Sequence, residues 1–205
     1  MKAVVLTKPC KAEEMTLTEI PVPQTRPGRV LIRVKAFGIN HSEVLLRQFE
    51  VAQDYIRKPI VPGIECVGEV IDPSDSGLAI GQRVMALMGG MGRSFNGSYA
   101  EYALLPVSHV FPIESKLDWD ELAAIPETFY TAYGSLRLSL QLSPDDTLLI
   151  RGGSSTVGIA ALQLAKAMGA KVISTTRSEK ESRFAPWLWC RRCYLGGRRF
   201  PQEIP

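Results

Sequence analysis

The chain has 205 residues, of which 45% are hydrophobic and 22% are charged, and its formal net charge is +3. These proportions are typical of a globular protein and exclude disorder along the whole length. The low net charge argues against a nucleic-acid partner, and no apolar stretch is long enough to span a bilayer. We therefore expect a cytoplasmic protein that binds neither nucleic acid nor membrane.

The first 110 residues consist mostly of short runs with β propensity, separated by proline and glycine. These runs lie at residues 3–6, 30–36, 65–71, 83–87 and 98–104. Their spacing predicts an antiparallel barrel or sandwich. One helical stretch, at residues 42–47, interrupts the β pattern, and Ser42 is its predicted N-cap.

Helices and strands alternate after Pro112. The predicted elements are helices at 118–124 and 128–138, a strand at 147–150, a helix at 157–168 and a strand at 171–175. The second helix is expected to direct a row of large side chains toward a packed face, namely Tyr130, Tyr133, Leu136 and Leu138. The last three elements form a β-α-β unit, which predicts a right-handed crossover between parallel strands.

A glycine-rich segment, residues 151–158, joins the first strand of this unit to its helix. Backbone N–H groups and the positive end of a helix attract a pyrophosphate at such a point, and small residues let it approach closely. We therefore predict a dinucleotide-binding loop made of Gly152, Gly153, Ser154, Ser155, Thr156, Val157 and Gly158. The alternative is a tight strand-to-helix turn that binds nothing.

The end of the second strand carries no acidic residue. In dinucleotide-binding folds an Asp or Glu at this point binds the ribose hydroxyls of NAD and repels a 2′-phosphate. Here hydroxyl and cationic side chains stand instead, which favours NADPH. The predicted phosphate-binding residues are Thr175, Thr176, Arg177 and Lys180. The alternative is that Arg177 and Lys180 are simply solvated at a strand end.

Five separated motifs resemble the quinone oxidoreductase-like group of the medium-chain dehydrogenase/reductase superfamily. Besides the glycine-rich loop and the strand after it, they are GINHSE at 38–43, PGIECVGEV at 62–70, GSYAEY at 97–102 and TAY at 131–133. The resemblance covers residues 1–181. It implies a GroES-like β-barrel domain at 1–120 and the start of an NADP-binding Rossmann domain, an α/β doubly wound parallel sheet, at 121–182. It also implies hydride transfer from NADPH to a quinone or another activated carbonyl or enone.

The resemblance implies catalysis without zinc. Zinc-dependent alcohol dehydrogenases of the superfamily carry a Cys and a His where this chain has Asn40 and Ile64, and neither is a suitable zinc ligand. A rearranged metal site using His41 and Cys66 is an open alternative. By resemblance, Asn40 lies near the nicotinamide and Thr131 bonds its carboxamide, although a loop Asn and a surface Thr are the plain alternatives.

Within residues 1–181 the chain departs from the family pattern at two points. A tyrosine that follows the GIN motif in quinone reductases has no counterpart, and no general acid is evident, so we expect the proton to come from solvent. Ser155 replaces the middle glycine of the loop, a change expected to weaken the approach of the phosphate.

The segment at 183–205 departs from the family pattern. It mixes Trp, Cys and Arg without helical or strand period, and Pro186 interrupts the expected helix. Reading its codons one base later permits the glycine-alanine-aspartate motif that the family has here, so we hypothesise a frameshifted terminus. We then expect an incomplete Rossmann sheet, low stability and little turnover. Whether the chain forms a homodimer is open.

Two other functions remain as alternatives. One is a non-catalytic nucleotide-binding or structural relative of the same fold. The other is a basic tail that binds zinc or nucleic acid through Cys190, Cys193 and the nearby arginines. A single C-x-x-C supplies only half of a zinc site, and with Cys10 and Cys66 isolated the four cysteines predict no disulfide framework.

Overall fold

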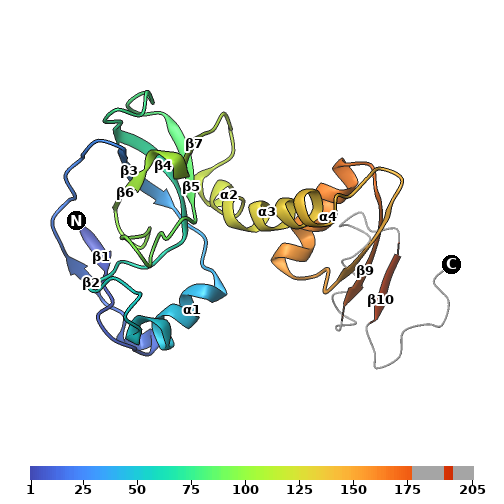
Figure 1. Cartoon of the computed structure of the whole chain (residues 1–205), viewed down its shortest axis with the longest axis horizontal. Helices are drawn as coiled ribbons and strands as arrows, with labels where there is room; N and C mark the ends of the chain where they lie inside the picture. Colours follow the sequence, from blue (N-terminus) through green and yellow to red (C-terminus); the bar gives the residue numbers. More distant parts are fainter. Residues whose placement is uncertain (177–191, 196–205) are drawn as a thin grey trace. The chain divides into compact units, whose positions relative to one another are not determined.

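The computed structural model of the protein describes residues 1–176 and, for the backbone alone, residues 192–195. The chain divides into two compact units, Met1–Glu127 and Thr128–Pro205 (Figure 1). The division lies within helix α3 (Pro126–Tyr133), whereas the sequence interpretation placed a domain boundary at residue 120.

The first unit is built on a curled antiparallel sheet of five strands in the order β6-β3-β4-β5-β7. The strands are β3 (Arg29–Ala36), β4 (Glu65–Asp72), β5 (Arg83–Leu87), β6 (Tyr102–Pro106) and β7 (Val110–Pro112). A separate two-stranded sheet joins β1 (Lys2–Val4) to β2 (Leu17–Glu19). The helices are η1 (Ala12–Glu14), α1 (His41–Gln48), η2 (Glu50–Ala52), η3 (Val107–His109) and α2 (Trp119–Ala123). The predicted antiparallel β domain is confirmed.

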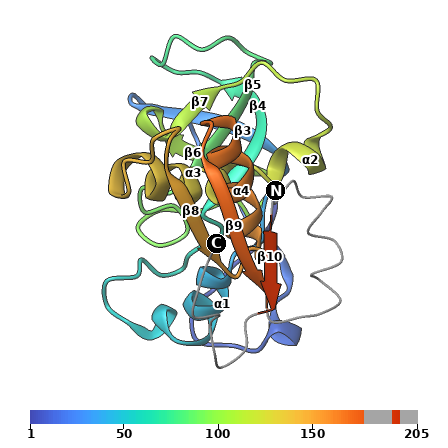
Figure 2. The ribbon, with the colours of Figure 1, turned by 90° about the vertical axis from the view of Figure 1, so that its right-hand side faces the viewer.

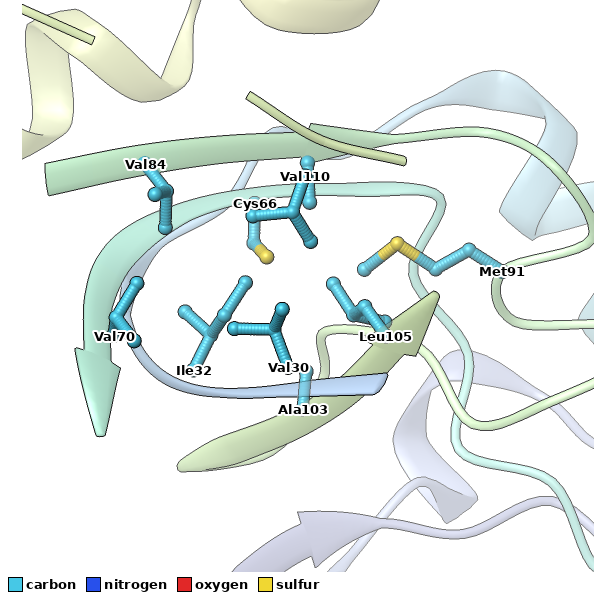
Figure 3. Packing of buried hydrophobic residues seen from close by; sticks show 10 residues of the cluster. Val30, Ile32, Cys66, Val70, Val84, Met91, Ala103, Leu105 and Val110 are labelled. Carbon is cyan, nitrogen blue, oxygen red and sulfur yellow. The ribbon is translucent and has the colours of Figure 1, made fainter. Parts of the chain in front are cut away.

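The concave side of this sheet encloses an apolar core. Strand side chains alternate between the two faces of a sheet, so Val30 and Ile32 of β3 share the inner face with residues two apart on the neighbouring strands. The core contains Val30, Ile32, Cys66, Val70, Val84, Ala86, Met91, Ala103, Leu105 and Val110. Figure 3 shows these side chains converging between the strands, with the sulfur of Cys66 directed inward.

The second unit contains a parallel sheet with strand order β10-β9-β8, whose strands lie side by side in Figure 2. Strand β8 (Thr147–Arg151) leads into helix α4 (Thr156–Ala167), which returns to strand β9 (Lys171–Thr176). This is the predicted β-α-β unit. Apolar side chains pack between α4 and the sheet, including Ile150, Leu162, Ala165 and Val172.

The segment at 183–205, whose side chains show no strand period, contains a strand at one place. Residues Arg192–Leu195 form β10, which pairs in parallel with β9. The exposed edge of a parallel strand offers a row of N–H and C=O groups, and these can pair with an extended backbone whatever its side-chain pattern. The rest of that segment lies outside the described residues.

The helix predicted at 128–138 also differs from the structure. Helix α3 gives way at Gly134 to a π-helix, η4 (Gly134–Ser139). Its wider hydrogen-bonding pattern changes the period, so the predicted row of packed side chains is broken. Leu136 is buried, but Tyr130, Tyr133 and Leu138 are exposed.

The N-cap of α1 was likewise assigned wrongly. Helix α1 begins at His41 with Asn40 as its N-cap, so Ser42 lies inside the helix. The Ser42 hydroxyl is buried and has no hydrogen-bond partner among the described residues. The helix begins earlier because the carboxylate of Glu43 accepts a hydrogen bond from the Asn40 N–H at 2.7 Å, which stabilises its first turn.

Replacing Leu105 by alanine is expected to lower the free energy of unfolding by about 2–5 kcal/mol, because Leu105 is fully buried in the core of the sheet. The matched control is Leu17→Ala, at a leucine that is 70% exposed, which is expected to change stability by less than about 0.5 kcal/mol. Urea unfolding followed by tryptophan fluorescence measures both. Equal losses would contradict the packing described for this unit.

Candidate functional site

The loop between β8 and α4 is held closely against the end of β9. Gly152 has a positive φ of 77°, which a glycine adopts without strain. The N–H groups of Gly152 and Gly153 both donate to the Thr175 carbonyl oxygen, at 3.1 and 2.9 Å. A Cβ on Gly153 would lie 1.7 Å from the Ser174 Oγ, so only glycine fits there. The predicted glycine-rich loop therefore has a defined, tightly packed shape.

Three N–H groups of this loop remain available to a ligand. Those of Gly152, Gly153, Ser155 and Gly158 are already hydrogen-bonded within the unit. The N–H groups of Ser154, Thr156 and Val157 have no hydrogen-bond partner among the described residues. The last two belong to the first turn of α4, where the helix dipole also favours an anion.

Ser155 is the N-cap of α4. Its Oγ accepts a hydrogen bond from the Gly158 N–H at 3.1 Å and donates to the Gly152 carbonyl oxygen at 2.8 Å. The serine that replaces the family's middle glycine thus closes the loop on itself. A Cβ on Gly158 would lie 2.5 Å from the Gly152 carbonyl oxygen, so glycine is also required where the helix crosses the turn.

The hydroxyl side chains predicted to face the cofactor phosphate lie at the end of β9. Thr175 and Thr176 are both buried. The Thr175 Oγ1 accepts from the Gly152 N–H at 3.3 Å, and the Thr176 Oγ1 lies 3.4 Å from the Ser154 Oγ. The threonines therefore brace the loop. Arg177 and Lys180 lie outside the described residues, as does the Cys190 of the C-x-x-C pair.

In the first unit, Asn40 is paired with a buried carboxylate. Its Nδ2 donates to the Glu65 Oε1 at 2.8 Å, and the other carboxylate oxygen of Glu65 accepts from the Glu127 N–H at 2.8 Å. Glu65 is only 2% exposed, and burial raises its pKa above the usual range even though both hydrogen bonds act in the opposite direction. A Cβ on Gly38 would lie 2.2 Å from the Glu65 Oε1, so glycine leaves the room that this carboxylate occupies.

A second buried carboxylate, Glu43, lies on α1. Its oxygens accept from the Asn40 N–H at 2.7 Å, the Ile64 N–H at 2.9 Å and the Tyr99 hydroxyl at 2.9 Å. Burial, followed by the nearby Glu43 charge, raises the pKa of Tyr99. The phenol therefore stays protonated and remains a hydrogen-bond donor to Glu43. These contacts fix the backbone on both sides of Asn40.

By the resemblance, Asn40 and Ile64 stand where zinc-dependent alcohol dehydrogenases carry two of their zinc ligands. The Ile64 side chain is buried and apolar. In the alternative site through His41 and Cys66, the Cys66 thiol lies in the core and burial raises its pKa to about 12, which opposes metal binding. Among residues 1–176 no group of three or more His, Cys, Asp or Glu side chains is arranged to hold a metal ion.

Thr131 lies on α3 in the second unit, with its side chain exposed and its carbonyl oxygen accepting from the Ser135 Oγ at 2.9 Å. Its expected contact with a nicotinamide carboxamide remains a prediction.

Sequence reasoning did not identify Glu43 and Glu65 as site residues. Glu65 had a visible signal, since it is an acid at the start of a largely apolar strand that becomes buried, and a buried carboxylate needs a partner. Glu43 had no such signal, because most residues of α1 are not buried. The partners of Glu65 could not be read from the sequence, because Asn40 and Glu127 are 25 and 62 positions away from Glu65.

Known proteins resemble this chain in sequence and in structure. Residues 26–115 match the alcohol dehydrogenase GroES-like domain. The quinone oxidoreductase of Homo sapiens is 34% identical over 168 residues, which cover 80% of this chain and 48% of that protein. The chain thus spans about half the length of the curated relatives it matches.

Two solved structures share the fold. The quinone oxidoreductase from Coxiella burnetii has a TM-score of 0.82 and 28% identity, covering 95% of this chain and 62% of that one. An NAD-dependent alcohol dehydrogenase has a TM-score of 0.85 and 33% identity, covering 94% and 63%. No helix within the described residues is long and apolar enough to cross a membrane.

The buried Glu65 predicts a specific pH dependence of stability. Since its pKa is raised in the folded protein, the unfolded chain loses this proton first as the pH rises. Folding then becomes less favourable until the pH passes the folded-state pKa, and the cost stays constant above it. Glu65→Gln cannot ionise, so its stability relative to the wild type is expected to increase as the pH rises from about 4 toward neutrality.

Urea unfolding at a series of pH values tests this expectation, with Glu121→Gln as the control because Glu121 is exposed. A constant difference between Glu65→Gln and the wild type across the pH range would show that Glu65 is not perturbed by burial.

Proposed function

We infer that this chain belongs to the medium-chain dehydrogenase/reductase superfamily and is related to its quinone oxidoreductases. We propose that it takes part in the NADPH-dependent reduction of a quinone or another activated carbonyl or enone. The observation that carries the proposal is the loop between β8 and α4. It presents the free N–H groups of Ser154, Thr156 and Val157 at the start of a 12-residue helix. This arrangement suits a pyrophosphate.

The residues of the loop fit a dinucleotide. Gly153 and Gly158 have no room for a side chain, so the backbone itself forms the surface that a phosphate would meet. Gly152 and Ser155 hold the turn, while Ser154, Thr156 and Val157 are the proposed N–H donors. When bound, NADPH supplies the hydride.

We propose NADPH in preference to NADH because the end of β9 offers no carboxylate to the adenosine ribose. Thr175 and Thr176 stand there, followed by Arg177 and, three positions on, Lys180. A guanidinium can bind a 2′-phosphate through two parallel hydrogen bonds, and an ammonium adds a point charge.

Asn40 is the proposed catalytic residue of the first unit. One Nδ2 hydrogen is donated to Glu65, which holds the carboxamide in one orientation. The other Nδ2 hydrogen has no partner among the described residues and is proposed to donate to the substrate oxygen. Glu65 and Glu43 act through Asn40 and are therefore positioning residues. Polarisation by a fixed amide takes the place of a zinc ion in this proposal. Thr131 is proposed to orient the nicotinamide carboxamide.

Fluorescence titration with NADPH and NADH tests the cofactor proposal. We expect NADPH to bind more tightly, and Arg177→Gln to reduce the preference for NADPH at least tenfold, the loss expected for a charge-assisted hydrogen bond. Lys171→Gln is the matched control, since it removes one positive charge at the opposite end of β9. Equal affinities for the two cofactors in the wild type would contradict the assignment of NADPH.

Oxidation of NADPH by 1,4-benzoquinone, followed by its absorbance, tests the catalytic proposal. Asn40→Ala is expected to lower kcat roughly a hundredfold while leaving NADPH affinity unchanged, because one preorganised donor to the substrate oxygen is lost. His41→Ala, at the exposed neighbouring residue, serves as the control. Tight NADPH binding without turnover in the wild type would favour the non-catalytic nucleotide-binding alternative.

A further inference from the structure

The first unit contains a pocket that the proposed reductase function does not use. Its volume is about 230 Å³. Ligand pockets for drug-sized molecules have volumes of roughly 300–1,000 Å³, so this pocket suits a smaller ligand. Four segments contribute to it: the one between β2 and β3, the one between η2 and β4, the loop before β6, and β6 itself. Its apolar lining includes Ile20, Pro21, Pro23, Val61 and Leu104.

Three arginines line the pocket, and none of its lining residues is acidic. They are Arg26 and Arg29, which flank the turn before β3, and Arg57 from the loop after η2. The turn is fixed because the Arg29 N–H donates to the Arg26 carbonyl oxygen at 3.1 Å. The Arg29 guanidinium lies over the Phe95 ring, 4.9 Å from its centroid, and is thereby held at the pocket.

The three guanidinium groups form no salt bridge and donate no hydrogen bond within the part of the chain that the structure describes. Other arginines of the unit do have acceptors. Arg93 pairs with Glu50 at 2.7 Å, and Arg83 donates to the Leu117 carbonyl oxygen at 2.7 Å. The pocket therefore gathers cationic donors whose hydrogen-bonding capacity is unused.

Asp75 and Asp72 are bonded to backbone N–H groups and form no salt bridge with these arginines within the described part of the chain. Asp75 accepts from the Gly28 N–H at 2.7 Å, and Asp72 accepts from the Ser74 N–H at 2.9 Å. Burial, followed by the positive charges of Arg26 and Arg57, lowers the pKa of Arg29, which indicates that the arginines repel one another. An anion with more than one charge would relieve this repulsion.

We propose that this pocket binds a phosphate or pyrophosphate group, either free or as the end of a small ester. Planar guanidinium groups bind phosphate oxygens through pairs of hydrogen bonds, and three arginines line this pocket. The apolar lining formed by Ile20, Pro21 and Pro23 accommodates the small organic part of an ester. The site lies wholly within the first unit and is independent of the β8–α4 loop.

Isothermal titration with sodium pyrophosphate tests the site, at a fixed ionic strength because exposed charges are screened by salt. The wild type is expected to bind pyrophosphate, and the Arg26→Gln/Arg57→Gln double variant at least tenfold more weakly. Both side chains are exposed, so the fold is expected to survive, and circular dichroism verifies this. Arg137→Gln is the matched control, since it removes an exposed arginine of the other unit.

Inorganic phosphate and phenyl phosphate then distinguish the two sources of the group. Tighter binding of phenyl phosphate than of phosphate assigns the pocket to an ester, and the reverse order assigns it to the free ion. Absence of pyrophosphate binding by the wild type would overturn the proposal. So would a loss in Arg137→Gln as large as that in the double variant, because the attraction would then be nonspecific.

Discussion

The organisation of the first unit around Asn40 depends on one buried carboxylate. Glu65 begins strand β4, receives the side-chain amide of Asn40 at the start of α1, and receives the backbone N–H of Glu127 at the start of α3. The starts of three elements that are far apart in the chain, β4, α1 and α3, thus meet at the two carboxylate oxygens of Glu65. Removing water from a carboxylate is costly, and the hydrogen bonds compensate for that cost only when all of the partners are in place. The orientation of Asn40 is therefore a property of the whole fold.

Much of the architecture could be predicted from the sequence, because its signals are local. Alternation along 30–36 and 65–71 corresponds to β3 and β4, and the glycine-rich segment at 151–158 does join a strand to a helix. Errors arose where the decisive interaction is not visible in the pattern. The change to a π-helix at Gly134 alters which side chains are buried. The residue types at 134–139 do not predict this change.

The candidate site was even less predictable from the sequence than the fold. Residue types predicted the location of the phosphate-binding loop, but not which of its N–H groups are free. That division follows from three acceptors, the Thr175 carbonyl oxygen, the Gly152 carbonyl oxygen and the Ser155 hydroxyl, which together bind four of the seven N–H groups from Gly152 to Gly158. Likewise, Asn40 was selected by resemblance alone. Its restraint by Glu65 required the fold to bring two segments 25 residues apart into contact.

Ser155 has a consequence for the energetics of any ligand at this loop. Its hydroxyl occupies the place that solvent or a guest oxygen would otherwise take at the Gly158 N–H, so the first turn of α4 keeps its shape when nothing is bound. A loop already ordered in the free protein loses little conformational entropy on association. The affinity for a ligand is then set by the N–H groups of the loop that remain unbonded. A serine in place of a glycine occupies one N–H group, that of Gly158, and in return makes the loop more rigid.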